Sequence, residues 1–285
     1  MSRLRDYYSL AKPGIIRGNI IAALAGFFLA SRGNVDISLL LSVIIGLSLV
    51  IASACVFNNV LDRSIDTRMQ RTKKRAVAAA RISPRSAVLY AGTLGLAGAL
   101  VLGLFTTTDA LVYAFIAHIL YVIAYGYTKR KSPLGTPVGA LPGALPPVIG
   151  YVAVLGSVDI VAIGLFLILF VWQMPHFYAI AIFRRDDYIA AGIPVLSAVK
   201  SVEHVKKRIA HYVMFLLPLI LWFGIVAELS AMYFVLTVVA VLFWQYVGFV
   251  NRNETDIQWA RKMFGTSLVV LLVICTSISV DASFI

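Results

Sequence analysis

Nine separate stretches of about twenty apolar residues constrain this chain more than any other feature of its sequence. They cover residues 14–31, 37–57, 86–106, 110–128, 138–157, 160–182, 209–228, 231–250 and 265–282. A stretch of ~20 apolar residues is long enough to cross the hydrocarbon core of a bilayer as a helix. Because every backbone polar group must be paired within lipid, the sequence predicts an all-α integral membrane bundle of about nine transmembrane helices.

The charge content indicates that the bilayer, rather than water, surrounds most of the chain. Of the 285 residues, 60% are hydrophobic and 13% are charged, whereas about 25% of the residues of a soluble domain are charged. No soluble domain or long linker separates the nine stretches, so residues 1–285 are predicted to form a single membrane domain. Cys55 and Cys275 lie inside apolar stretches and are interpreted as packing residues.

The positions of lysine and arginine predict the orientation of the bundle. If all nine stretches span the membrane, every one of the 25 cations except Arg32 lies on the side of the N-terminus. Cytoplasmic connections carry such an excess. The N-terminus is therefore predicted to be cytoplasmic and the C-terminus outside, in the bacterial cytoplasmic (inner) membrane. The net charge of +12 then reflects topology, and no nucleic-acid partner is expected.

Two predicted cytoplasmic connections, residues 58–85 and 183–208, are long, and long connections are often functional. In the first, Asn58, Asp62 and Asp66 are spaced four residues apart. If the preceding helix continues, this spacing places all three on one face. Mg²⁺ binds carboxylate oxygens together with substrate phosphates. The three residues are therefore candidate metal ligands.

Cations follow these acids directly. Arg71 and Arg75 are candidates for binding the oxygens of a diphosphate, because arginine pairs with phosphate through two parallel hydrogen bonds. A second interpretation is that the basic run only sets the topology and that the acids are its solvated partners; for Lys73, Lys74 and Arg81 this interpretation is preferred. Asn59 is either a further ligand or a polar neighbour.

The pattern N-x-x-x-D-x-x-x-D after the second of nine spans resembles the UbiA-type intramembrane prenyltransferases, which transfer a prenyl chain from a diphosphate to a lipophilic acceptor. The family often has Asp directly after the first Asn, where this chain has Asn59. Four further stretches extend the resemblance over nearly the whole chain, to the branch of the family that uses heme as acceptor. They are KPGIIRGNI, DRSIDTRMQRTKKR, YGYTKRKSPLGTPVGALPGALPPVIGY and WQMPHFYAIAIFRRDDYIAAGIPVL.

This resemblance implies that farnesyl diphosphate and heme B (protoheme IX) are the substrates. A farnesyl group would be transferred to a heme vinyl group with addition of water, giving heme O and diphosphate in a Mg²⁺-dependent reaction. Heme-copper oxidase assembly proteins are implied as partners. The implied catalytic residues are Asp62, Asp66, Arg71, Arg75 and Lys129, and the implied diphosphate-binding residues are Arg71, Arg75, Lys129 and Arg130. A topological role is the alternative for the Lys129–Arg130 pair.

The connection after the sixth span carries a second Asp-rich motif in quinone-type relatives, and that motif is reduced here. Phe177 and Arg184 stand where those relatives often have Asp, while Asp186 and Asp187 remain. Asp187 is the first candidate for the metal and Asp186 the second. The alternative is a solvated cluster of charges.

His176 lies near the end of the sixth span. Neutral imidazole is a common ligand of heme iron, and the resemblance to heme-accepting enzymes makes His176 the candidate heme ligand, ahead of His118. A histidine on an apolar helix is otherwise usually a satisfied core residue. Aromatic faces stabilise cations, and the candidates for an allylic cation are Tyr121, Tyr125, Tyr178 and Trp172.

Three other functions account for parts of the sequence. A prenyltransferase acting on a quinone precursor or another lipophilic acceptor would share the first motif, but the reduced second motif and His176 disfavour it. A transporter or channel would need intramembrane charges along a pathway, whereas the charges here gather on one side. A heme-binding assembly protein without catalysis would release no diphosphate.

Overall fold

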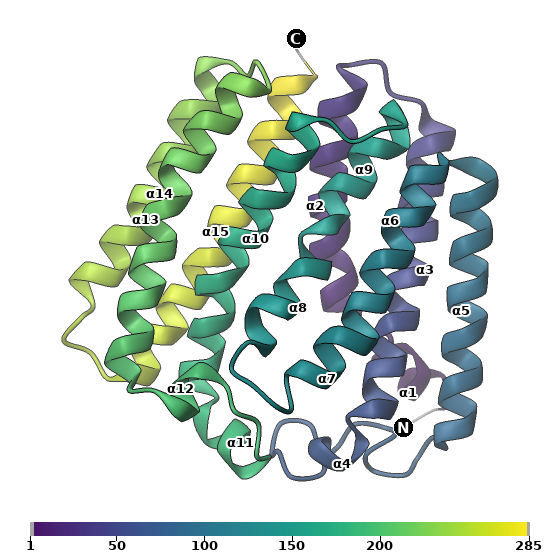
Figure 1. Ribbon diagram of the computed structural model, residues 1–285, viewed down its shortest axis with the longest axis vertical. Helices are drawn as coiled ribbons and strands as arrows, with labels where there is room; N and C mark the ends of the chain where they lie inside the picture. The colour runs from purple at the N-terminus through teal and green to yellow at the C-terminus, as the bar shows by residue number, and fades with distance from the viewer. Residues whose placement is uncertain (1–2, 284–285) are drawn as a thin grey trace.

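The structure, a computed structural model, describes residues 3–283, and this range contains helices and no strand (Figure 1). Nine helical segments within it are long and apolar enough to cross a membrane. They are α2 (Pro13–Ser31), α3 (Ile37–Leu61), α5 (Pro84–Phe105), α6 with η1 and α7 (Thr108–Thr128), α8 with α9 (Gly135–Leu155), α10 (Ile160–Phe183), α13 (Val202–Val226), α14 (Ala231–Val250) and α15 (Asp256–Ala282). The predicted all-α bundle of nine spanning helices is confirmed.

The short helices gather at one end of the bundle. They are α1 (Arg3–Leu10), α4 (Arg63–Asp66), α7 (Gly126–Thr128), α11 (Arg185–Ala190) and α12 (Leu196–Val199), all at the bottom of Figure 1. The last turn of α15 lies at the opposite end. The connections rich in lysine and arginine therefore share one end, which we call the basic end. That this end faces the cytoplasm stays a prediction.

Two spanning helices begin more than one helical turn earlier than predicted. Helix α13 starts at Val202 rather than at residue 209, and α15 starts at Asp256 rather than at residue 265. Each has a polar first turn capped by a hydroxyl, since Ser201 Oγ accepts from the His204 N–H (3.3 Å) and Thr255 Oγ1 accepts from the Gln258 N–H (3.4 Å). The hydropathy pattern detects only the part of a helix that lies in lipid, so these polar turns were missed.

Two spans are irregular where they approach the basic end. The fourth contains a π-helical segment, η1 (Leu120–Tyr125), between α6 (Thr108–Ile119) and α7. The fifth is divided at Ala144 into α8 (Gly135–Gly143) and α9 (Leu145–Leu155), with Pro142 inside α8 and two prolines after the break. Proline cannot donate a backbone hydrogen bond, and π-helical turns are frequent at functional sites. Helix α8 packs against both η1 and α10.

The backbones of α2 and α9 touch directly. A Cβ placed on Gly26 would lie 1.8 Å from the carbonyl oxygen of Pro147, and one on Gly150 would lie 1.9 Å from that of Ala23. Only glycine therefore allows this approach. The two helices form a closed seam in the middle of the buried core.

The two long connections at the basic end pack against each other. Ile65 and Met69 from the first contact Ala191 and Ile193 from the second in a small buried cluster, with Tyr188 packed beside it. This cluster brings the two predicted motifs to the same place, although they are separated by more than a hundred residues in the sequence.

Candidate active site

The Asn58, Asp62 and Asp66 side chains continue one helical register across the end of α3 and into α4. The Asp62 N–H donates to the Asn58 carbonyl (2.9 Å) and the Asp66 N–H donates to the Asp62 carbonyl (2.8 Å), so the i to i−4 pattern survives the short break after Leu61. All three side chains are buried, with exposed fractions of 2%, 8% and 1%. The stripe expected from the spacing is present.

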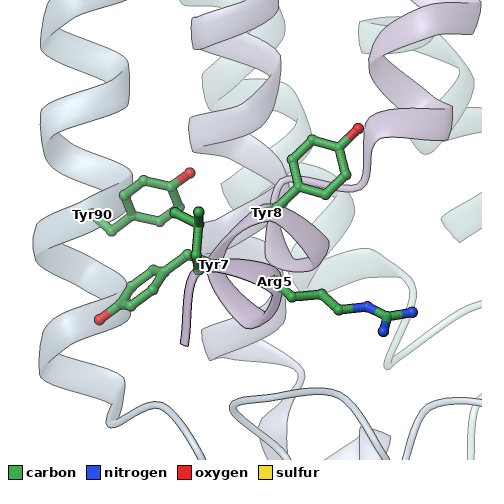
Figure 2. Close-up of a pocket in the computed structure, with 5 residues that line it drawn as sticks. Arg5, Tyr7, Tyr8 and Tyr90 are labelled. Carbon is green, nitrogen blue, oxygen red and sulfur yellow. The ribbon is translucent and has the colours of Figure 1, made fainter. Parts of the chain in front are cut away.

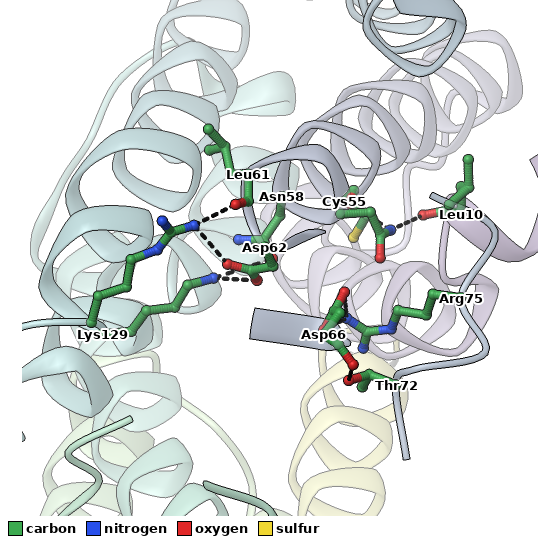
Figure 3. Close-up of polar contacts among 11 residues, drawn as sticks. Leu10, Cys55, Asn58, Leu61, Asp62, Asp66, Thr72, Arg75 and Lys129 are labelled. Atoms are coloured by element: carbon green, nitrogen blue, oxygen red, sulfur yellow. Dashed lines mark hydrogen bonds and ion pairs between the residues drawn. The ribbon is translucent and has the colours of Figure 1, made fainter. Parts of the chain in front are cut away.

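Asp62 is held by two cations from the end of the fourth span. Lys129 Nζ donates to Asp62 Oδ2 (2.5 Å), and the Arg130 guanidinium donates to Asp62 Oδ1 (3.2 Å) and to the Leu61 carbonyl (2.6 Å). Asn58 completes the group when its amide nitrogen donates to Asp62 Oδ2 (2.7 Å) and its oxygen accepts from Lys129 (3.0 Å). Figure 3 shows Lys129 pointing toward Asp62. The predicted Lys129–Arg130 pair therefore lies at the predicted acids.

Asp66 has a separate cation. Arg75 Nη1 donates to both carboxylate oxygens of Asp66 at 2.9 Å, and Thr72 Oγ1 donates to the Asp66 carbonyl (3.1 Å) (Figure 3). These contacts fold the basic segment back over α4. Buried carboxylates need such partners, because a buried unpaired charge is strongly destabilising.

Burial also acts on the cation of Lys129. Its removal from water lowers the pKa of the Lys129 ammonium, while the adjacent Asp62 carboxylate raises it. The ammonium lies 4.8 Å from the centre of the Tyr125 ring, whose face favours a positive charge. Lys129 is thus placed as a charged group between an acid and an aromatic ring.

The donor set fits Mg²⁺ only if a substrate completes it. Within residues 3–283, no three His, Cys, Asp or Glu side chains are close enough to hold a metal by themselves. Two carboxylates and one amide oxygen are nevertheless present at the stripe. Mg²⁺ is usually bound by one or two carboxylates together with phosphate oxygens, so the residues fit a Mg²⁺-diphosphate and do not fit a closed metal site.

The remaining predicted residues lie further out. Asp187 is half-buried and accepts a hydrogen bond from the backbone N–H of Gln70 (3.1 Å), which ties the two connections together. Asp186 and Arg71 are exposed, and neither has an ion-pair partner among residues 3–283. Arg184 follows α10 and lies against the Phe183 ring (5.5 Å). The second motif is therefore close in the fold but does not join the ion pairs of the first.

Two residues near the site were not identified from the sequence. Lys12 occupies the corner between α1 and α2 with a left-handed backbone (φ 53°, ψ 65°). The pKa of Lys12 is lowered to about 8, chiefly by burial and in part by the nearby positive charges of Arg75 and Lys129. Tyr188 is the other. Burial raises the pKa of its phenol, and the positive charge of Arg71 acts in the opposite direction.

The corner at Lys12 is fixed by Asn59. The Asn59 amide nitrogen donates to the carbonyls of Leu10 and Cys55, both at 2.9 Å. Its side-chain oxygen has no partner among the described residues. Asn59 therefore connects α1 to α3, which favours the interpretation as a polar neighbour. The only signal for Lys12 in the sequence is the KPG stretch that opens the first span.

His176 lies in an aromatic slot between α10 and α15. Its ring stacks against Trp172 (4.9 Å between centres) and packs at a tilt against Phe264 (4.9 Å). Its Nδ1 is 2.7 Å from Ser267 Oγ. The exposed fraction of His176 is 9%. Trp172 also donates from Nε1 to the Ser267 carbonyl (2.9 Å).

The other predicted aromatic and histidine candidates have different surroundings. Tyr121 lies 5.4 Å from Tyr125, the residue beneath Lys129. Tyr178 instead packs toward Tyr212 on α13 (6.1 Å). The Nε2 atom of His118 lies 3.1 Å from the hydroxyl oxygen of Ser53, which is on α3.

A wide groove elsewhere on the molecule is separate from this site. It lies between α1 and the start of α5, has a volume of about 760 Å³, and is lined by Leu4, Arg5, Tyr7, Tyr8 and Tyr90 (Figure 2). Tyr7 and Tyr90 meet edge to face at 5.0 Å. Figure 2 shows Arg5 and Tyr8 pointing away from this pair, so the groove does not gather polar groups around one point.

Comparison with known proteins places the chain within one family. Residues 19–268 match the profile of the UbiA prenyltransferase family. A protein named protoheme IX farnesyltransferase 2 from Pseudomonas fluorescens (strain Pf0-1) is 44% identical over 282 residues, covering 98% of this chain and 95% of the relative. Protoheme IX farnesyltransferase from Yersinia pseudotuberculosis (serotype O:1b) is 42% identical over 280 residues, with the same coverage.

Solved structures share the fold at low sequence identity. A structure described as digeranylgeranylglyceryl phosphate synthase in membranes superposes with a TM-score of 0.81 at 18% identity and covers 100% of both chains. A UbiA homologue from Archaeoglobus fulgidus bound to GPP and Mg²⁺ has a TM-score of 0.67 at 13% identity, covering 96% of this chain and 99% of the homologue. At these identities the likeness is one of fold alone.

Proposed function

The chain belongs to the UbiA prenyltransferase family, and we propose that it transfers a farnesyl group from farnesyl diphosphate to a vinyl group of heme B, giving heme O and diphosphate. The acceptor and the prenyl donor follow from the names of relatives that are 42% and 44% identical over almost the whole chain. The observation in this molecule that carries the proposal is the group of buried carboxylates at the basic end, each paired with lysine or arginine.

This group can exchange its partners without leaving a buried charge unpaired. Lys129 and Arg75 now bind Asp62 and Asp66. With Mg²⁺ bound, the carboxylates would hold the metal and the two cations would bind the oxygens of the diphosphate, so that each charge would keep an opposite neighbour. Arg130 and the exposed Arg71 add two further cations for the same oxygens.

Mg²⁺ would be held by Asn58, Asp62 and Asp66, with Asp187 and then Asp186 as outer candidates, and would supply Lewis-acid polarisation of the leaving oxygens. The C1–oxygen bond of farnesyl diphosphate breaks, and its electron pair leaves with the diphosphate. Lys129 and Arg75 stabilise the negative charge that develops there. The Tyr125 ring, beside Lys129, offers a face to the allylic cation.

The acceptor then supplies the electrons for the new bond. The vinyl group of heme B attacks the allylic carbon, and the cation left on the vinyl carbon takes up water and loses a proton. The product carries a hydroxyl group and a farnesyl chain. His176 is the proposed ligand of the heme iron, and its aromatic slot holds the ring in one orientation.

The cellular setting is part of the same proposal. The chain lies in a bacterial inner membrane with its basic end on the cytoplasmic side, in agreement with the positive-inside rule. In this orientation the diphosphate site is open to the water-soluble headgroup of the substrate. Heme-copper oxidase assembly proteins are the proposed recipients of the product.

A product assay tests the proposal. Purified protein in lipid vesicles with heme B, farnesyl diphosphate and Mg²⁺ is expected to yield heme O, detected by chromatography and mass spectrometry, together with one equivalent of diphosphate. Chelation of the metal is expected to stop both. Prenylation of a quinone precursor in place of heme B would contradict the acceptor assignment, and heme binding with no diphosphate release would contradict catalysis.

A further inference from the structure

The hydrogen bonds around His176 define which of its nitrogens carries the proton. Ser267, fully buried on α15, makes two short side-chain contacts through its hydroxyl. Its oxygen lies 2.6 Å from the Phe264 carbonyl oxygen and 2.7 Å from His176 Nδ1. A hydroxyl has only one proton to share between these two contacts.

Only one assignment satisfies both contacts. A carbonyl oxygen cannot donate, so the Ser267 proton must point to Phe264; otherwise two acceptor oxygens would face each other at 2.6 Å. Ser267 Oγ then accepts from His176, and the Nδ1 of His176 must carry a proton. The neutral imidazole is consequently the Nδ1–H tautomer, with the lone pair on Nε2.

The hydrogen bonds of His176 distinguish its two ring nitrogens. Trp172 stacks on the ring with an interplanar angle of 26°, and Phe264 packs against it at 37°. Among residues 3–283, Nε2 has no hydrogen-bond partner, whereas Nδ1 is engaged. A histidine that binds a metal through one nitrogen usually donates from the other to a fixed acceptor, which sets the tautomer and the ring orientation.

We propose that Ser267 is a positioning residue that fixes His176 in the Nδ1–H form, so that Nε2 presents its lone pair to the iron of a porphyrin. This inference rests on the proposed function for the identity of the ligand. It assigns the ligating atom and adds a residue from the last spanning helix, 91 positions away from His176 in the chain. Trp172 adds a second contact to the same residue by donating to the Ser267 carbonyl.

The chain offers a matched control on the same helix. Ser277 is also buried, and its hydroxyl also donates to a carbonyl three residues earlier, that of Ile274 (3.0 Å). Among the residues that the structure describes, it accepts from no histidine. Ser267→Ala and Ser277→Ala therefore remove equivalent hydroxyl groups and equivalent backbone contacts. They differ in the loss of the acceptor for Nδ1.

Titration of ferric and ferrous heme B into purified protein, followed by visible absorption, is the first measurement. His176→Ala is expected to abolish the spectrum of an imidazole-bound heme. Ser267→Ala is expected to weaken heme affinity by about tenfold, the lower end of the range for loss of a partner behind a metal ligand. Ser277→Ala is expected to match the unchanged protein, and Ser267→Thr, which keeps the hydroxyl, to restore most of the affinity.

Nitrogen-15 NMR of histidine-labelled, heme-free protein tests the tautomer without any variant. A protonated Nδ1 and an unprotonated Nε2 on His176 support the inference, and the reverse pattern overturns it. Equal heme affinity in Ser267→Ala and Ser277→Ala, or an unchanged heme spectrum in His176→Ala, also overturns it. Failure to form heme O with these spectra intact would instead contradict the proposed function and leave the histidine assignment standing.

Discussion

The two pairs of aspartates at the basic end differ in how the fold treats them. Asp62 and Asp66 are buried and each is bound by lysine or arginine. Within residues 3–283, Asp187 is half-buried and accepts a hydrogen bond only from a backbone N–H of the other connection, and Asp186 is exposed. The first pair is therefore held in place by neighbouring charges before any substrate arrives, whereas the second lies at the rim of the site.

This difference separates two roles that a sequence motif alone would merge. Burying two carboxylates and their cations is costly unless every charge is paired, so the first pair forms a preassembled ionic group. The second pair needs no such partners because water reaches it. We therefore expect the chemistry to depend strongly on the first pair and modestly on the second.

The largest effect is expected for Asp62→Ala and Asp66→Ala. Each variant removes a carboxylate that would hold the metal, and kcat is expected to fall by at least ~10²-fold, as for loss of one group that stabilises transition-state charge. Heme O formation measured at saturating substrate is the readout. Asp66→Asn keeps the shape and should be equally inactive; near-normal turnover in either position would remove the metal assignment.

A smaller effect is expected at the cation. Lys129→Ala should raise KM for farnesyl diphosphate and lower kcat, together by about 10–100-fold, because it removes a charge-assisted contact from both substrate and transition state. Lys131→Ala, two residues further and exposed, is the control. Equal kinetics in the two variants would show that the Lys129–Arg130 pair serves topology only.

Substitutions in the second aspartate pair test whether the two pairs differ in role. Asp187→Ala is expected to lower kcat/KM by about tenfold or less, since it loosens the contact with Gln70, and Asp186→Ala by about twofold or less, in line with the small effects of most exposed substitutions. Steady-state measurement of kcat/KM for each variant shows which loss is larger. A loss at Asp187 as large as at Asp66 would make it a direct metal ligand and erase the distinction between the pairs.

A small effect is also expected from the titration of Lys12. Because burial lowers the pKa of Lys12 to about 8, the side chain is a cation below pH 8 and loses its charge as the pH rises through that value. KM for farnesyl diphosphate should therefore rise a few-fold between about pH 7 and 9, since one cation beside the diphosphate is lost. Lys12→Arg should flatten this dependence, because arginine keeps its charge. If KM depended on pH in Lys12→Arg as it does in the unchanged protein, Lys12 would not be the group whose titration causes the dependence.

Local patterns were sufficient to predict the spans and the first motif. The apolar stretches report lipid contact directly, and the four-residue spacing of Asn58, Asp62 and Asp66 follows from the helix itself. The contact between Lys129 and Asp62 joins residues 67 positions apart, and only the family resemblance indicated it. The resemblance did not provide the distances or the burial.

Other parts of the site depend on tertiary packing that leaves no local signal. Ser267 is one of several serines in a spanning helix, and nothing near it in the sequence points to His176. Trp172 was expected to stabilise an allylic cation, and in the structure it stacks on His176 and binds the Ser267 carbonyl. The corner at Lys12 likewise depends on a contact between Asn59 and Leu10, 49 residues apart.

The glycine contacts between α2 and α9 restrict how the bundle can move. At Gly26 and Gly150 the two main chains meet with no side chain between them, so separating the helices would open a void that no flexible side chain can refill. Any widening of the bundle is therefore expected along other helix pairs, while α2 and α9 stay together as one rigid unit.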